Sequence, residues 1–129
     1  MGWDFRSDLP IYTQLMRQLS ERIVSGVYAP GERLPSVRDL AVDAGVNPNT
    51  VQRALTDLER QELVFSQRTS GRFVTESAEK IRAEKLRMAE EKTQEFLQAM
   101  QQLGCSREEV FSLLRRAAET ENHQEEGNA

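Results

Sequence analysis

The sequence has very few of the residues that build disulfide frameworks and metal sites. Its 129 residues include a single cysteine, Cys105, and a single histidine, His123. A disulfide within one chain needs two cysteines, and protein zinc sites draw on several cysteine and histidine ligands. The acidic cluster of Glu90, Glu91 and Glu95 has no such neighbours, so we interpret it as a solvated helix face. We therefore expect no bound metal and no cofactor.

Long apolar runs and enzyme signatures are absent as well. No stretch approaches the ~18 apolar residues that a membrane-spanning helix requires, and the N-terminus lacks the basic and then apolar pattern of a secretory signal peptide. We find no nucleophile paired with a base, no metal-ligand cluster and no phosphate-binding glycine loop. We therefore expect a cytoplasmic protein that is not an enzyme and makes no membrane contact.

Lysine is missing from residues 1–75, where all nine basic residues are arginine and balance nine acidic residues. The net charge of −4 comes from residues 76–129, which carry eight basic and twelve acidic side chains. An acidic total argues against a nucleic-acid partner, but charge has to be counted by segment. Arginine is the basic residue best suited to forked contacts with phosphate and guanine. The first part of the chain therefore remains a candidate for binding nucleic acid.

Hydrophobic periodicity predicts three helices followed by a hairpin in this first part. The first helix covers about residues 10–25, Ser36 is expected to cap a short second helix, and Asn47 is expected to cap a third with Pro48 at its first position. The run "LVFSQRTSGRFVT" then changes to a β-strand pattern and predicts a hairpin with Gly71 in its turn. The whole chain is expected to be mostly α-helical with one small β-hairpin.

Two short helices joined by a tight turn and followed by a hairpin form a winged helix-turn-helix. In this motif the second helix enters the major groove, and its N-terminal side chains meet the base edges. Asparagine and glutamine can pair with adenine, and arginine with guanine, through two hydrogen bonds each. The hairpin tip can approach a phosphate or the minor groove. From the residues, we expect DNA to be contacted by Arg38, Asn49, Thr50, Gln52, Arg53, Arg68, Ser70, Gly71 and Arg72.

Simpler interpretations of these residues stay open. Asn47 and Thr50 would serve as helix caps whether or not DNA is bound. Arg38 would be an ordinary solvated charge, and Arg68 and Arg72 would be edge-strand charges that prevent aggregation. Capping does not explain why Asn49, Gln52 and Arg53 follow one another on the same helix.

From Glu76 onward the composition shifts to Glu, Lys, Gln and Ala, which is typical of long helices. Apolar residues step along the chain at alternating spacings of three and four until Gly104 interrupts them, and a capping box from Ser106 to Glu109 starts a second helix. We predict an antiparallel helix pair over residues 76–121, followed by a disordered tail over residues 122–129. The apolar seam is either an intramolecular core or a dimer interface. Because helix-turn-helix proteins mostly bind as two-fold dimers, we expect dimerisation through Leu86, Ala89, Thr93, Phe96, Met100, Leu103, Phe111 and Leu114.

The segments "PIYTQL", "SGVYAPGERLPSVRDLAVDAGVNPNTVQRALTDLERQELV" and "SGRFV" resemble the GntR family of bacterial transcription regulators, especially its YtrA-type branch. The resemblance covers residues 9–75 and implies a winged-helix DNA-binding domain, with a short helical part behind it for dimerisation. It also implies that Asn47 and Pro48 belong to the DNA surface, and we include the helix cap Ser36 among the expected DNA contacts. The hairpin departs from the family pattern "RGxGTFV", because "QRTSGRFV" has one glycine fewer and an extra arginine.

The resemblance implies a homodimeric repressor that acts on a palindromic double-stranded operator, and we expect it to regulate its own operon. The alternative is a winged helix that binds another protein, which the balanced charge of residues 1–75 keeps open. The helical part is too short for an ordinary enclosed ligand domain. We expect a small-molecule effector to bind between subunits or at the junction near Glu76–Ile81.

Overall fold

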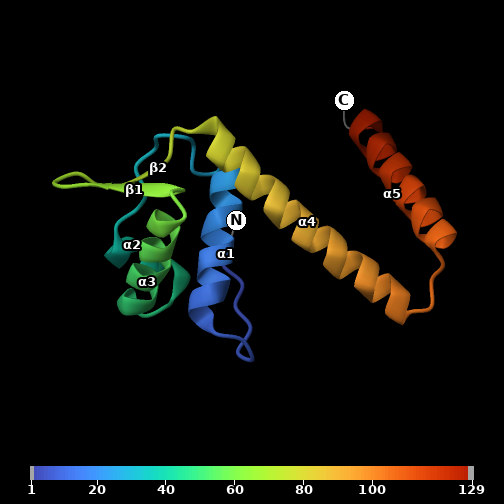
Figure 1. The fold of residues 1–129 in the computed structure, drawn as a ribbon, viewed down its shortest axis with the longest axis horizontal. Helices are drawn as coiled ribbons and strands as arrows, with labels where there is room; N and C mark the ends of the chain where they lie inside the picture. Colours follow the sequence, from blue (N-terminus) through green and yellow to red (C-terminus); the bar gives the residue numbers. More distant parts are fainter. Residues whose placement is uncertain (1, 128–129) are drawn as a thin grey trace. The chain divides into compact units, whose positions relative to one another are not determined.

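The computed structural model describes residues 2–127, with side chains up to residue 122. The elements in chain order are α1 (Ile11–Val24), α2 (Val37–Ala44), α3 (Pro48–Arg60), β1 (Val64–Gln67), β2 (Gly71–Val74), α4 (Ala78–Gln102) and α5 (Arg107–Gly127) (Figure 1). The chain divides into two compact units, one extending to Arg87 and the other starting at Met88. The predicted fold class, mostly α with one small hairpin, is confirmed. The first unit takes in the start of α4, whereas the sequence placed the boundary after Thr75.

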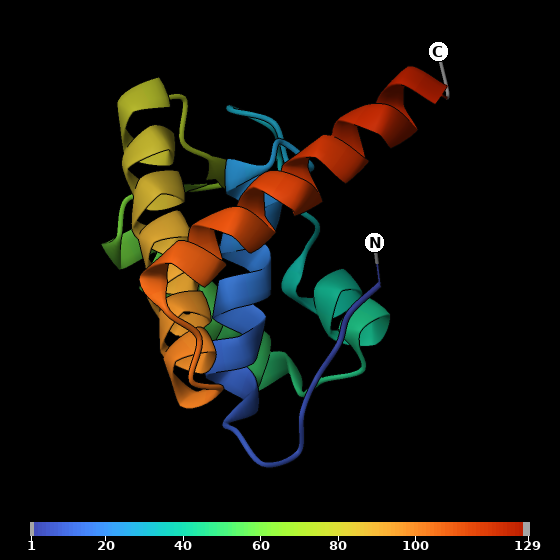
Figure 2. The ribbon, with the colours of Figure 1, turned by 90° about the vertical axis from the view of Figure 1, so that its right-hand side faces the viewer.

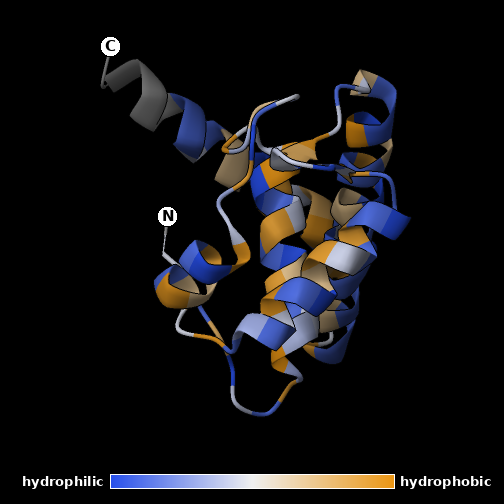
Figure 3. Cartoon of the chain, turned by 90° about the vertical axis from the view of Figure 1, so that its left-hand side faces the viewer, coloured by the Kyte–Doolittle hydropathy of each residue, from blue (hydrophilic) through white to orange (hydrophobic). Residues whose placement is uncertain are grey.

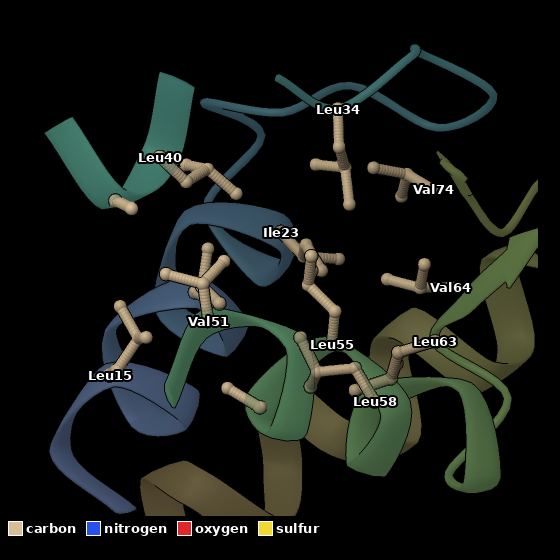
Figure 4. Close-up of a cluster of buried hydrophobic side chains, with 13 residues drawn as sticks. Leu15, Ile23, Leu34, Leu40, Val51, Leu55, Leu58, Leu63, Val64 and Val74 are labelled. Carbon is tan, nitrogen blue, oxygen red and sulfur yellow. The ribbon is translucent and has the colours of Figure 1, made fainter. Parts of the chain in front are cut away.

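One apolar cluster holds the first unit together. Helix α1 contributes Leu15, Leu19 and Ile23 to this core, each at most 1% exposed. In Figure 4 Leu15 and Ile23 lie among side chains of α2, α3 and the hairpin. Leu19 belongs to the same cluster, and Ile81 at the start of α4 packs against it. Burying one such aliphatic side chain stabilises a fold by roughly 1.5–3 kcal/mol. The buried face of α3 consists of Val51, Ala54, Leu55 and Leu58.

The helix-turn-helix begins and ends its helices where the sequence indicates. The hydroxyl of Ser36 accepts a hydrogen bond of 3.0 Å from the backbone N–H of Asp39. Helix α2 stops at Gly45, which has φ +69°, a conformation that favours glycine because it has no Cβ. Asn47 Oδ1 accepts a hydrogen bond of 2.8 Å from the N–H of Asn49. The two caps satisfy backbone N–H groups at the starts of α2 and α3. The hydropathy colours of Figure 3 show hydrophilic and hydrophobic residues mixed along the helices, as expected for helices that bury one face.

The hairpin is anchored by the segment between α1 and α2, residues 31–34. Strands β1 and β2 are antiparallel. Gly71, which the sequence placed in the turn, is the first residue of β2, directly after the three-residue turn, and has φ +99°. The chain before α2 runs along β2, since Leu34 N–H donates to the carbonyl of Arg72 and Val74 N–H donates to the carbonyl of Glu32, both at 2.9 Å. The hairpin tip projects beyond α2 and α3 (Figure 1). In this hairpin, which forms the wing, β2 is therefore hydrogen-bonded along both edges, to β1 on one side and to residues 32–34 on the other.

The residues before α1 have no regular secondary structure, but they are hydrogen-bonded to the first unit. The side-chain amides of Gln14 and Gln18, one turn apart on α1, each form two hydrogen bonds with the backbone, at Arg6 and Asp4 respectively. Trp3 Nε1 then donates to Asp43 Oδ2 at 2.8 Å. Figure 2 shows the segment running from the base of α1 toward α2. This N-terminal segment ties α2 to α1.

In the second unit, the end of α4 and α5 run in opposite directions and diverge from the loop that joins them (Figure 1). The predicted capping box is confirmed, with Ser106 N–H donating to Glu109 Oε1 at 3.1 Å and Glu109 N–H donating to Ser106 Oγ at 3.2 Å. Helix α5 continues to Gly127, past residue 121, where we expected a disordered tail to begin. Residues 128 and 129 of that expected tail lie outside the described residues. Over the described chain, no helix is both long and apolar enough to cross a membrane.

Candidate nucleic-acid interface

The first turns of α3 present a row of exposed polar side chains. Asn49, Gln52 and Arg53 are exposed, while Thr50 is half-buried. The opposite face of α3 is buried in the hydrophobic core, so these exposed side chains point away from the core. This placement is consistent with the sequence prediction that the polar residues at the start of this helix are available to contact DNA.

Arg53 does not extend freely from α3. Its guanidinium carbon lies 3.8 Å from the centroid of the Tyr12 ring, in a cation–π contact. Tyr12 is at the second position of α1 and is half-buried. Such a contact at a partly exposed site contributes roughly 0.5–1 kcal/mol. Tyr12 therefore restricts the position of Arg53, a predicted DNA contact.

The hairpin carries one exposed arginine at its tip and another at its side. Arg68 lies in the turn and is exposed, next to the half-buried Ser70. Arg33, from the segment along β2, is also exposed, and its Nε lies 3.3 Å from the point where a Cβ on Gly71 would be. Sequence reasoning missed Arg33 because nothing local indicates that residues 31–34 pair with β2. A glycine at 71 leaves room for this arginine beside the wing.

Arg72 is paired inside the first unit rather than left free. Its Nε donates to Glu59 Oε1 at 2.6 Å, and the Ser66 hydroxyl donates to the same oxygen at 2.5 Å. Its Nη1 also donates to Gln52 Oε1 at 3.4 Å. Burial of Glu59 raises its carboxyl pKa, but the hydrogen bonds from Ser66 and Arg72 and the charge of Arg72 outweigh this and leave the pKa lowered. Arg72 thus connects the wing to two positions on α3.

Two of the remaining predicted DNA contacts are helix caps, and two others are exposed at the surface. Ser36 and Asn47 both use their side-chain oxygens as helix caps. Pro48 occupies the first position of α3 and is exposed. Arg38 is exposed on α2. Among the described residues, no group of three or more histidine, cysteine, aspartate or glutamate side chains could hold a metal ion.

The predicted dimerisation residues are mostly exposed. Leu86 is 53% exposed and Leu103 is 77% exposed, and of the eight predicted residues only Met100 is half-buried. The seam is therefore not an intramolecular core within the described chain. Thr93 and Phe96 of α4 and Phe111 and Leu114 of α5 line one cavity of about 550 Å³ in the second unit. The two helices thus bring four of the eight predicted contact residues to one apolar surface, whereas Leu86, Ala89, Met100 and Leu103 do not line it.

Known proteins are similar to this chain in both their sequences and the arrangement of their helices and strands. The family model for bacterial regulatory proteins of the gntR family matches residues 11–74. The chain is 38% identical to the transcriptional repressor YtrA of Bacillus subtilis over 95 residues, which are 73% of each chain. It superposes on a GntR family transcriptional regulator from Listeria monocytogenes with a TM-score of 0.81 and 34% identity, over 87% of this chain and 98% of that one.

A further solved structure contains DNA. The DNA-binding domain of AraR in complex with operator ORX1 matches with a TM-score of 0.51 and 30% identity, over 58% of this chain and 93% of that one. The match to YtrA agrees with the expected branch, and the wing, the recognition helix and their caps all lie within the residues that the family model covers. The chain therefore belongs to the GntR family of bacterial transcriptional regulators, and its winged helix-turn-helix is the DNA-binding domain of that family.

Proposed function

We propose that this protein is a homodimeric repressor that binds a palindromic operator upstream of its own gene in the cytoplasm. It acts by occupying DNA and carries out no reaction of its own. The observation that carries the proposal is the exposed side of α3, where Asn49, Gln52 and Arg53 lie together at the end that this motif turns toward the major groove. The repressor activity named for the relative YtrA supports repression here.

Two further observations support operator binding by a dimer. Arg68 is exposed at the tip of the wing and Arg33 is exposed beside it, where both suit phosphates flanking the bases read by α3. Phe96 and Phe111 line the apolar cavity of the second unit, and their side chains are 38% and 49% exposed. Large aromatic side chains at an apolar surface are typical of protein interfaces. A second copy of the chain would cover them and place two recognition helices on the two halves of a palindrome.

The test is binding to a duplex that covers the region upstream of the protein's own gene, measured at several salt concentrations. Several phosphate contacts per subunit release counterions, so the logarithm of affinity should fall steeply with the logarithm of salt. A shuffled duplex of the same composition is the control and should bind more weakly. An affinity that hardly changes with salt, or that is equal for both duplexes, contradicts operator binding.

A winged helix that binds another protein is distinguished by a double substitution. Gln52→Ala with Arg53→Ala removes two exposed side chains from α3 and leaves its buried face intact. Repression through DNA predicts that the variant folds normally but loses its preference for the operator over the shuffled duplex. An unchanged preference would favour the protein-interaction module.

We place the site of a small-molecule effector at the start of α4. A groove of about 450 Å³ in the first unit is lined by Val24, Pro30, Ile81, Arg82 and Lys85, among others. Apolar walls with two basic side chains suit a small anionic molecule, and a ligand here would bias the direction of α4 and thus the spacing of the recognition helices. Screening small anions for an increase in melting temperature tests this, and the absence of any stabilising compound would contradict it.

A further inference from the structure

Arg72 occupies the wing position where the family pattern "RGxGTFV" has threonine, and in this chain it bridges two residues of α3. Gln52 and Glu59 are seven residues apart on α3, which is close to two helical turns, so they lie on the same face. Arg72 donates from Nε to Glu59 and from Nη1 to Gln52. Its side chain is only 19% exposed. This placement withdraws Arg72 from the set of free arginines that would meet a phosphate.

The pairing determines which end of the Gln52 amide remains for DNA. Arginine carries five N–H donors and no acceptor, so the atom of Gln52 that faces it has to be the carbonyl oxygen. The NH₂ group of Gln52 is then the end left to meet a base. Glutamine recognises adenine through two bonds, donating to N7 and accepting from the N6 amino group, and the second bond needs that carbonyl oxygen.

Guanine and thymine, unlike adenine, can be fully paired in the major groove by a side chain that only donates hydrogen bonds. In the major groove guanine offers two acceptors, N7 and O6, and thymine offers the acceptor O4. A glutamine that presents only NH₂ can donate to these atoms without leaving a base donor unpaired. Opposite adenine, the N6 amino group would have to donate to the remaining lone pair of the Gln52 carbonyl, next to the Arg72 cation. A base donor placed beside a guanidinium meets a weakened acceptor, and a poorly made hydrogen bond at a buried interface is costly.

We propose that Arg72 is a positioning residue that turns Gln52 into a reader of base acceptors, so that this protein prefers guanine or thymine over adenine at the base that Gln52 meets. Glu59 and Ser66 hold Arg72 in place by sharing one carboxylate oxygen with it. The inference rests on the proposed operator binding and adds the base preference of one contact.

The experiment uses the full-length protein and a randomised duplex pool, from which the wild type selects its preferred sequence. Gln52→Ala locates the base in question as the position where discrimination is lost. At that position the wild type should bind guanine or thymine roughly tenfold better than adenine, and Arg72→Thr should shift the preference toward adenine because the Gln52 carbonyl is released. The slope of log affinity against log salt should stay unchanged, because no phosphate contact is removed.

Matched variants separate positioning from simple stabilisation. Arg72→Lys retains a cationic donor and should retain the preference, and Glu59→Gln should shift it toward adenine less than Arg72→Thr does. A preference for adenine in the wild type, the same preference in Arg72→Thr, or a salt slope that drops by about one would overturn the proposal. Failure of the wild type to enrich any sequence from the pool would instead contradict operator binding itself, so the two failures are distinguishable.

Discussion

Arg53 on α3 lies with its guanidinium carbon 3.8 Å from the centroid of the Tyr12 ring on α1. The contact joins the helix that reads DNA to the helix that supports it. Because arginine loses rotamer freedom when it binds, a ring that already restricts its orientation lowers the entropy lost on binding. We therefore expect Tyr12 to affect recognition without touching a base.

We expect Tyr12 and Arg53 to be energetically coupled. A double-mutant cycle with Tyr12→Leu and Arg53→Gln, followed by urea unfolding, should give a coupling free energy of roughly 0.5–1 kcal/mol. Tyr12→Phe keeps the ring and should keep most of the coupling. Strictly additive single effects would show that the contact does not stabilise the protein.

Asn47 and Asn49 should separate stability from recognition. Asn47 caps α3 through its Oδ1 atom, so Asn47→Ala should lower the free energy of unfolding by about 1 kcal/mol. Asn49 contributes only its backbone N–H to that bond, so Asn49→Ala should leave stability nearly unchanged while altering operator preference. Thermal unfolding and competition binding with mutated duplexes measure the two effects. The opposite pattern, with Asn49→Ala the less stable variant, would contradict these assignments.

We expect Trp3 to contribute to the free energy of unfolding, although it lies near the N-terminus. Its indole donates to Asp43, stacks with Phe5 and lies under Arg22, whose guanidinium carbon is 3.7 Å from the ring centroid. Trp3→Ala removes all three contacts and should cost roughly 1–3 kcal/mol of unfolding free energy. Trp3→Phe keeps an aromatic ring and loses only the N–H donor, so it should cost less. Equal losses in the two variants would mean that stacking does not contribute.

Glu59 should make stability depend on acidity. Its pKa is lowered in the folded protein, so the carboxylate stabilises the fold above the ordinary pKa of 4.5, and this contribution is lost as pH falls through the lower folded value. The difference in unfolding free energy between wild type and Glu59→Gln should be at most about 1 kcal/mol near pH 7 and should vanish in strong acid. Urea unfolding at a series of pH values measures it. A difference that persists unchanged into strong acid would contradict the ion pair with Arg72.

The cavity of the second unit should control the oligomeric state. Phe96→Asp and Phe111→Asp place a charge on its apolar lining and should weaken self-association roughly tenfold or more. Sedimentation velocity over a range of concentrations measures this. Leu113→Asp is the matched control, because Leu113 is 40% exposed on the same helix but does not line the cavity. Equal weakening by all three variants, or by none, would place the interface elsewhere.

The sequence was sufficient for the helices of the first unit, their caps and the hairpin turn. Each depends on short-range chemistry: apolar residues at helical spacing, a side-chain oxygen ahead of a helix, and a glycine where φ is positive. The exposed side of α3 followed from the same pattern, because the residues left over from the buried stripe can only point outward.

Contacts between residues distant in the chain were decided by the tertiary structure alone. The pairing of residues 31–34 with β2, the docking of Trp3 on Asp43 and the bridge from Arg72 to Gln52 and Glu59 join segments whose sequences carry no sign of one another. Side-chain pairing of this kind depends on where the core places each backbone. The sequence therefore determined which side chains could read DNA, and the fold decided that Arg72 is held by Glu59 and that the Gln52 carbonyl is already engaged.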